Sequence, residues 1–279
     1  MNDFNLRELQ LCELEILKKV IEAFEKNNLS YFALFGTLIG AVRHEGFIPW
    51  DDDVDIGMPR KDYDTFIANA DKILPDELQI LHYTKNWRVP NKICRIENKN
   101  TTMAPLDKNG NIIEWQNHGV QIDIFPIDGC PATEQERVRF FKKIRKMMVK
   151  DTLFRQQISN HYSLKHNLVL LALSPIVAVL GRTYYIKKYN NFLRNIDAQK
   201  TNIYSDVGMS LDPIKTWSYD IFNDFEYKKF ENIKLKCPKG FDEFLKIYYG
   251  DYMALPPKEK QIPLHTAYKY DFTKSYLEE

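Results

Sequence analysis

The acid run, residues 50–55 with the sequence WDDDVD, constrains the fold and chemistry of this chain more than any other segment. From Asp53 to Met58 acidic and apolar residues alternate, and a period of two predicts a β-strand with one buried face. Asp53 and Asp55 then point to the same face, and Asp51 joins them if the strand begins early. Carboxylates this close repel one another unless a cation lies between them. Because all these ligands are oxygens, the run predicts a site for Mg²⁺ or Mn²⁺.

Three further features distinguish the acid run from an ordinary solvated acidic turn. Gly36-Thr37 ends an apolar strand and opens a helix, a place where backbone N–H groups bind phosphate. Arg43 lies between that turn and the acid run. Asp123 is isolated among apolar residues of a predicted strand, where its burial is costly without a cation or hydrogen-bond donors. These features together predict a charged site rather than a solvated loop.

Hydrophobic periodicity and turn residues divide the rest of the chain into helices and strands. Helices are predicted over residues 6–27, 60–70, 133–159, 184–195 and 241–249. Strands are predicted over residues 31–35, 53–58, 78–82, 91–96 and 119–125, with a small hairpin over 225–236. We therefore expect an α/β protein in which residues 1–130 form the catalytic core, with a mainly helical region over residues 131–279 packed on it.

Composition argues against several classes of protein. The chain has 279 residues and a formal net charge of +1, so no overall positive field recruits nucleic acid, and we expect no nucleic-acid partner. The N-terminus lacks a basic region followed by an apolar one, which argues against a secretory signal. The four cysteines have no metal-binding spacing between any two of them. We therefore expect reduced thiols in a cytoplasmic protein.

The apolar segment, residues 168–180 with the sequence LVLLALSPIVAVL, is shorter than the roughly 20 apolar residues that span a bilayer. Basic residues flank it on both sides, namely Lys165, Arg182, Lys187 and Lys188. Pro175 is expected to break the segment into two short helical pieces. Two readings stay open: a buried core helix, or a peripheral contact with a membrane whose anionic headgroups attract the flanking charges.

Two long blocks of sequence resemble a known family. FGTLIGAVRHEGFIPWDDDVDIGMPR, followed later by GVQIDIFPIDGCP, resembles the LicD family of phosphocholine transferases and its fukutin-like relatives, within the nucleotidyltransferase superfamily. The tail from Tyr249 to Pro257, followed by His265, is similar to the C-terminal signature of that family. Residues 135–200 carry no signature of it. The resemblance implies a nucleotidyltransferase-like mixed sheet flanked by helices.

The same resemblance implies an activity. Family members transfer a phospho-alcohol from a CDP-activated donor to a sugar hydroxyl, so we expect transfer of phosphocholine from CDP-choline with release of CMP. The acceptor would be a cell-surface glycan, such as teichoic acid or lipopolysaccharide, or its lipid-linked precursor. Asp53 and Asp55 match the metal-ligand positions, and Asp123 matches the third acid, which either completes a metal site or takes the acceptor proton. Thr37 stands where serine is commoner, and both residues carry a hydroxyl.

Further residues are candidates for substrate contacts. Trp50 adjoins the acid run and offers an aromatic face to a choline cation. The remaining candidates are the phosphate turn Gly36 and Thr37, the cations Arg43, Lys92 and Arg95, the neighbouring Asp51, and His265 of the tail. Lys92 and Arg95 are expected to share one strand near Asp123.

Several alternative functions remain open from the sequence. A true nucleotidyltransferase would attack the α-phosphate and leave a nucleotide on the acceptor. Another CDP-alcohol, with ethanolamine, glycerol or ribitol, would use the same site. A glycosyltransferase or a non-catalytic binding protein fits less well, since the former usually has a longer nucleotide-binding region before its acids. We expect a cytoplasmic protein that lies peripherally at the inner face of the plasma membrane if the apolar segment contacts lipid.

Overall fold

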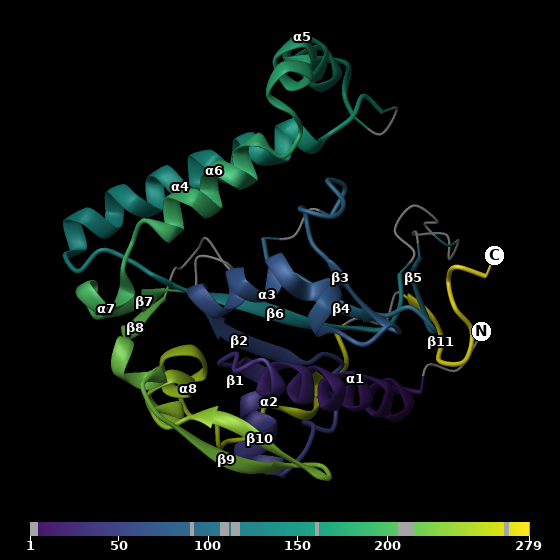
Figure 1. The fold of residues 1–279 in the computed structure, drawn as a ribbon, viewed down its shortest axis with the longest axis vertical. Coiled ribbons are helices and arrows are strands. Elements are labelled where there is room, and N and C mark those ends of the chain that lie inside the picture. The colour runs from purple at the N-terminus through teal and green to yellow at the C-terminus, as the bar shows by residue number, and fades with distance from the viewer. Residues whose placement is uncertain are drawn as a thin grey trace. The chain divides into compact units, whose positions relative to one another are not determined.

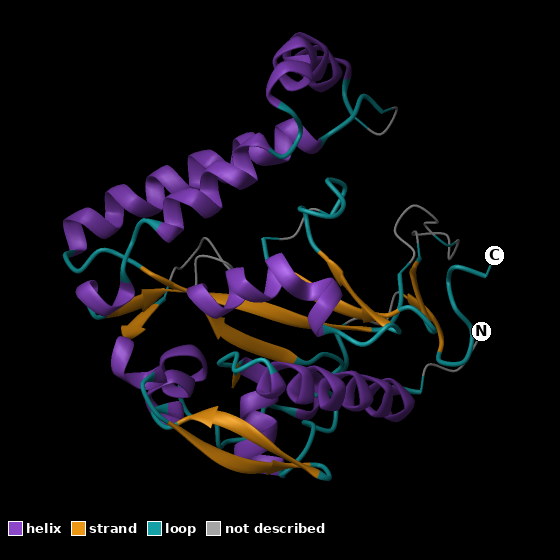
Figure 2. Ribbon diagram, viewed as in Figure 1, coloured by secondary structure: helices purple, strands orange, loops and turns teal. Residues whose placement is uncertain are grey.

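The computed structural model describes residues 5–89, 92–106, 112, 118–159, 162–205, 215–264 and 268–278. The first part of the chain contains α1 (Leu6–Lys26), β1 (Phe32–Ala33), α2 (Phe35–Ile39), the π-helical turn η1 (Gly40–His44), β2 (Asp55–Pro59), α3 (Arg60–Ile73), β3 (Leu78–Leu81), β4 (Cys94–Asn98), β5 (Thr102–Pro105) and β6 (Gln121–Gly129). Figures 1 and 2 show how these helices and strands are arranged. The protein is an α/β protein, as predicted.

The second part of the chain is mostly helical before it returns to strands. It contains α4 (Glu134–Arg155), α5 (Leu164–Leu180), α6 (Tyr184–Arg194), α7 (Ala198–Thr201), β7 (Ile203–Ser205), β8 (Thr216–Ser218), η3 (Tyr219–Phe222), β9 (Phe225–Phe230), β10 (Ile233–Pro238), α8 (Phe241–Tyr249), η4 (Lys258–Lys260) and β11 (Tyr268–Asp271). β9 and β10 form the predicted hairpin. β11 pairs with β5, so the tail returns to the N-terminal part of the chain.

The described residues form two compact units. One contains Met1–Leu81, Cys94–Pro126 and Asp220–Glu279, and the other contains His82–Ile93 and Ile127–Tyr219. These units differ from the predicted halves, because residues 220–279 group with the first unit rather than with the helices before them. The assignment of catalysis to residues 1–130 stays a prediction.

The main sheet of the first unit has β6 at its centre, with β2 and β4 on either side of it. The strand order is β1-β2-β6-β4-β3, and β6 runs on to pair with β7 in the second unit. Ile56, Ile96, Ile122 and Ile124 are each exposed by 1% or less, as expected for central strands made of β-branched residues. The acid-bearing strands are thus held rigidly by buried apolar neighbours.

Helix α1 buries one apolar stripe in the first unit. Its N-cap Asn5 accepts hydrogen bonds from the backbone N–H groups of Arg7 and Glu8, which otherwise lack intrahelical partners. The core stripe includes Leu9, Leu17 and Phe24, all with no exposed surface. Gln10 and Glu13 are also buried in α1. These two polar residues are exceptions to the apolar stripe, and both lie close to the acid run.

The second unit is built around α4 and α6, which lie side by side (Figure 1). Its core contains Tyr83, Cys130, Phe140, Ile144, Met147, Met148, Ile186, Tyr189 and Leu193. Helix α4 begins at the N-cap Thr133, whose Oγ1 accepts from Glu136 N and donates to Glu136 Oε2 at 2.7 Å. Helix α5 joins α4 and α6 along the chain, and its one buried residue is Leu170.

The prediction that Pro175 breaks the apolar segment is wrong. Helix α5 continues from Leu164 to Leu180 with Pro175 inside it. Proline lacks the N–H that would bond the carbonyl of Leu171, but Ser174 Oγ donates to that carbonyl at 2.8 Å. The serine side chain therefore replaces the missing backbone hydrogen bond. The alternative that the segment is a buried core helix is also wrong, because Leu168 is 55% exposed and Val179 is 85% exposed.

By length and composition, no single helix among the described residues is suited to cross a membrane. Helices α5 and α6 satisfy that requirement only as a pair, with a bend of 60° between them.

Candidate functional site

The acid run lies at the entrance to β2. Its first residues form the loop between η1 and β2, and the strand begins at Asp55, so the predicted strand started two residues early. Thr37 Oγ1 accepts a hydrogen bond from Asp55 N at 2.8 Å. Both side chains are buried, with Thr37 exposed by 3% and Asp55 by 8%. The predicted helix-opening turn therefore fixes the first residue of the acid-bearing strand.

Strand β6 brings Asp123 to the same place. Asp123 N donates to the carbonyl of Val54 at 2.8 Å, and Val54 lies between Asp53 and Asp55. Arg95 of β4 is the cross-strand neighbour of Asp123, and its Nε lies 2.9 Å from Asp123 Oδ1. The structure thus gathers the three predicted acids, from the loop, β2 and β6, with one guanidinium beside them.

The negative charges of the carboxylates in this cluster repel one another. Burial raises the pKa of Asp55 well above its usual range, and the negative charges of Asp53, Asp123 and Asp51 raise it further. These like charges therefore all disfavour the charged form of Asp55. A cation bound among these oxygens would relieve the repulsion, which makes the cluster chemically suited to a hard divalent ion.

Glu13 of α1 is a further carboxylate in the cluster, and we did not predict it from the sequence. Its side chain is 3% exposed, and its Oε2 atom is buried with no hydrogen-bond partner among the described residues. Burial raises the pKa of Glu13 well above its usual range, and the charges of Asp53 and Asp51 add to that effect. The signal in the sequence was an acid on the apolar face of an amphipathic helix, one turn from Leu9 and Leu17.

Gly36 allows the loop to approach the start of α2. A Cβ atom at this position would lie 2.4 Å from Asp51 Oδ2, well inside van der Waals contact. The residue before it, Phe35, has a φ of 43°, in the left-handed region that side chains rarely adopt. The close approach of Asp51, together with this turn, explains why glycine stands at position 36.

The described residues contain no group of three or more His, Cys, Asp or Glu side chains already arranged around one metal ion. The donor set nevertheless fits Mg²⁺ or Mn²⁺, because it consists of carboxylate oxygens whose mutual repulsion a cation would relieve. Glu13 Oε2, buried with no hydrogen-bond partner in the part of the chain that the structure describes, supports the same fit.

Comparison with known proteins identifies the family. Residues 28–173 match the family described as "LicD/FKTN/FKRP, nucleotidyltransferase domain". The lipopolysaccharide cholinephosphotransferase LicD of Haemophilus influenzae is 31% identical over 278 residues, which cover 97% of this chain and 99% of that protein. The chain belongs to the LicD family. Uncharacterized proteins of Rickettsia prowazekii and Rickettsia typhi are each 40% identical, over 29% and 27% of this chain respectively.

The part of the chain that matches the LicD family contains all three predicted acids, Asp53, Asp55 and Asp123. It also contains Gly36, Thr37, Arg43, Trp50, Asp51, Lys92 and Arg95. Glu13 precedes the matched region, although the relative from Haemophilus influenzae aligns with almost the whole chain.

The predicted basic residues Arg43, Lys92 and Arg95 lie in different surroundings. Arg43 donates to the carbonyls of Tyr252 and Ala254, so it holds the segment after α8. Burial lowers the pKa of Arg43, and the charge of Asp51 opposes that effect. Lys92 precedes β4 and belongs to the second unit, so the prediction that it shares a strand with Arg95 is wrong. Burial lowers the pKa of Lys92, whose charge interacts with Asp151.

The remaining candidates of this LicD-family chain concern substrate recognition. The Trp50 ring is partly exposed and meets the His44 ring edge to face, with 6.3 Å between the centroids. His265 lies outside the described residues. Tyr249 at the end of α8 is 46% exposed, and its raised pKa comes from burial of its hydroxyl and from the charges of Asp55, Asp51 and Asp53. Tyr249 is thus an aromatic residue at the site that the tail signature contained but the sequence analysis did not select.

Proposed function

We propose that this chain is a metal-dependent transferase that moves phosphocholine from CDP-choline to a sugar hydroxyl of a lipopolysaccharide-type glycan, releasing CMP. The observation that carries the proposal is the meeting of Asp53, Asp55 and Asp123 in one cluster of a LicD-family chain. The related protein from Haemophilus influenzae, named a lipopolysaccharide cholinephosphotransferase, supports both the transferred group and the acceptor class. Teichoic acid and other cell-surface glycans remain acceptors to be tested beside lipopolysaccharide.

The proposed reaction breaks the bond between the phosphocholine phosphorus and the oxygen that bridges it to CMP. The acceptor hydroxyl oxygen attacks that phosphorus, and the bridging oxygen leaves with CMP. Asp53 and Asp55 are the residues that would hold Mg²⁺ or Mn²⁺, which supplies neutralisation of the phosphate charge when bound. Asp123 either completes the cation site or accepts the hydroxyl proton. Arg95, paired with Asp123 at 2.9 Å, holds that carboxylate in position.

The choline group requires an aromatic environment rather than another anion alone. A quaternary ammonium is attracted to the faces of Trp and Tyr rings. Trp50 precedes the acids along the chain, and Tyr249 lies close enough to three of them for their charges to raise its pKa. We therefore assign the choline contact to these two rings, with Arg43 beside Asp51 as a phosphate contact.

A panel of CDP-alcohols tests the proposal. Purified protein with Mg²⁺ or Mn²⁺ should release CMP from CDP-choline faster than from the ethanolamine, glycerol and ribitol analogues, and should do so only when a glycan acceptor is present. Chelation of the metal should stop the release. Transfer of a nucleotide to the acceptor would instead establish the alternative attack on the α-phosphate. No turnover with any donor would overturn the proposal.

The proposed acceptor partner is lipid-linked, and α5 supplies the surface for it. Within the second unit the helix exposes a broad apolar face, which includes Leu164, Leu168, Val169, Leu171, Ile176 and Val179, whereas Leu170 on the other side is buried. A helix that lies on a membrane surface buries one such apolar face in lipid. Exposed Lys187 and Lys188 lie just beyond the helix, and Tyr162 just before it. Aromatic and basic residues at the edge of an apolar element favour a membrane interface with anionic lipid.

Liposome sedimentation tests this contact and the proposed location at the inner face of the plasma membrane. The protein should bind anionic vesicles more strongly than neutral ones, and high salt should weaken the binding. Leu171→Glu should reduce binding several-fold. Val138→Glu is a matched control, because Val138 is 58% exposed on α4, close to the 56% of Leu171. Binding that ignores charge and salt, or an equal loss in both variants, would overturn the membrane proposal.

A further inference from the structure

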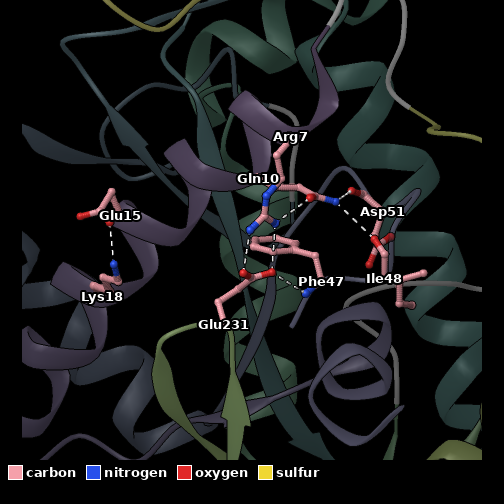
Figure 3. Close-up of polar contacts among 8 residues, drawn as sticks. All are labelled: Arg7, Gln10, Glu15, Lys18, Phe47, Ile48, Asp51 and Glu231. Carbon is pink, nitrogen blue, oxygen red and sulfur yellow. Dashed lines mark hydrogen bonds and ion pairs between the residues drawn. The ribbon is translucent and has the colours of Figure 1, made fainter. Parts of the chain in front are cut away.

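Three side chains, two from α1 and one from between β9 and β10, form a network that holds the backbone leading into the acid run (Figure 3). Gln10, buried in α1, donates from Nε2 to the carbonyl of Asp51 at 2.9 Å and to that of Ile48 at 3.3 Å. Asp51 is two residues before Asp53. A buried amide therefore fixes the chain just before the acids that are assigned to the cation.

The next contact fixes the orientation of that amide. Arg7 Nη1 donates to Gln10 Oε1 at 3.1 Å, one turn earlier on the same helix. Arginine only donates and a carbonyl only accepts, so Gln10 must point its oxygen at Arg7 and its NH₂ at the loop. A carboxylate of the same shape would lose both bonds to the loop. The position thus specifies glutamine by its chemistry rather than by its size.

Glu231, between β9 and β10, is the third member of this hydrogen-bond network, which consists of residues 7, 10 and 231. Arg7 donates to both of its carboxylate oxygens, at 3.0 Å from Nη1 and 2.7 Å from Nη2. Phe47 N donates to Glu231 Oε1 at 3.3 Å. The loop is therefore held at residue 47 by Glu231 and at residues 48 and 51 by Gln10.

The side chains that make these polar contacts line a pocket beside the loop. A cavity of about 820 Å³ lies there, lined by Asn5, Leu6, Arg7, Glu8, Gln10, Phe47, Pro49 and Glu231. None of the three predicted acids lines this cavity, so it is separate from the acid cluster. Among the described residues, the buried side chains of Phe47 and Ile48 anchor the loop, and hydrogen bonds from Gln10 and Glu231 fix its backbone at residues 47, 48 and 51.

We propose that Gln10 is a positioning residue for phosphate transfer, oriented by Arg7 and Glu231, and that it sets the place of Asp51 and Asp53. The inference rests on the proposed function. Displacement of a catalytic group by about 1 Å can reduce a rate about a hundredfold, so a small movement of this loop is sufficient. The network acts through the acids and makes no contact with substrate.

The test compares two substitutions on the same helix. Gln10→Met removes the loop contacts, whereas Lys18→Met removes an exposed ion pair with Glu15, 2.6 Å in length and also drawn in Figure 3. Gln10→Met should lower kcat for CMP release at least about tenfold, change KM for CDP-choline less than about twofold, and accelerate amide exchange in residues 47–52. Lys18→Met should leave all three quantities unchanged.

Arg7→Met is the second variant, because Arg7 is exposed and its loss leaves the core intact. It should reproduce the change in kcat and exchange in weaker form, even if Gln10→Met fails to fold. Wild-type kcat in both folded variants, or an equal loss in Lys18→Met, would overturn the positioning role. A wild-type protein that releases no CMP would overturn the proposed function, and the inference would fall with it.

Discussion

The acid cluster and helix α5 depart from the usual distribution of residues in opposite directions. In the cluster, charged side chains are buried, with Glu13 exposed by only 3% and Asp55 by 8%. In α5, apolar side chains are exposed, up to 85% at Val179. Buried charges and large exposed apolar surfaces both cost free energy unless something binds them. The proposed function assigns a partner to each region, a cation to the acid cluster and lipid to α5.

The largest expected effect comes from substitutions that remove a negative charge from the acid cluster. Asp53→Asn and Asp55→Asn should each abolish transfer, because each removes an oxygen charge assigned to the cation. The fold should persist, and the thermal midpoint without metal should stay the same or rise, since the substitution relieves repulsion. Turnover assays and thermal melts measure the two effects. Near-normal turnover of either variant in saturating Mg²⁺ would show that the site is assigned wrongly.

Asp123→Ala should reduce the rate at least about a hundredfold, the usual loss for a general base, and more if the cation site collapses. Circular dichroism must accompany the assay, because the substitution also removes the partner of Arg95. A variant that unfolds outright would favour a structural role for Asp123. A folded variant with a small rate loss would remove it from the catalytic set.

A third test asks whether the buried carboxylate of Glu97 has a structural role rather than a catalytic one. Glu97 has no exposed surface, yet its oxygens accept from Gln79 Nε2 at 2.6 Å, Gly119 N at 2.7 Å and Tyr276 OH at 2.9 Å. Glu97→Gln should leave transfer unchanged and lower the unfolding free energy by about 1–3 kcal/mol, since a donor would replace an acceptor. A large loss of turnover without loss of stability would contradict this structural role.

The pH dependence of that variant has a defined sign. Burial raises the pKa of Glu97 in the folded protein, so the fold binds a proton that the unfolded chain, with a pKa of about 4.3, releases more readily. The stability that Glu97 contributes is complete below about pH 4.3 and declines as pH rises through the raised pKa. Urea denaturation of both proteins across this range should show the wild-type advantage over Glu97→Gln shrinking with increasing pH.

The sequence was sufficient for features that depend on local periodicity. Alternation predicted the first acid-bearing strand, and Asp123 among apolar residues predicted a second, because side-chain direction in a strand follows from position. The catalytic role of these acids stays a prediction. Helix α1 was predicted over residues 6–27 and is observed from Leu6 to Lys26. The family resemblance rested on these same segments.

Features that depend on packing between distant segments were not accessible. Gln10 and Glu13 face the acid run only because of how α1 docks, which its own sequence does not specify. The pairing of β5 with β11 joins residues more than 160 positions apart, as Thr102 with Asp271. Pro175 was misread because a neighbouring side chain, Ser174, satisfied the carbonyl that proline leaves open. In each case a tertiary or side-chain contact outweighed the local pattern.

The smallest expected effect is on stability, for a substitution at an exposed apolar residue of α5. Val179→Gln should change the unfolding free energy by no more than about 0.5 kcal/mol, because an exposed side chain loses little packing when it is replaced. Leu170→Ala is the matched control in the same helix, since Leu170 is 6% exposed and its truncation should cost about 2–5 kcal/mol. Chemical denaturation measures both variants, and vesicle binding should weaken in Val179→Gln despite its intact stability. A large destabilisation by Val179→Gln would mean that α5 is packed against protein, and the contrast with the acid cluster would no longer hold.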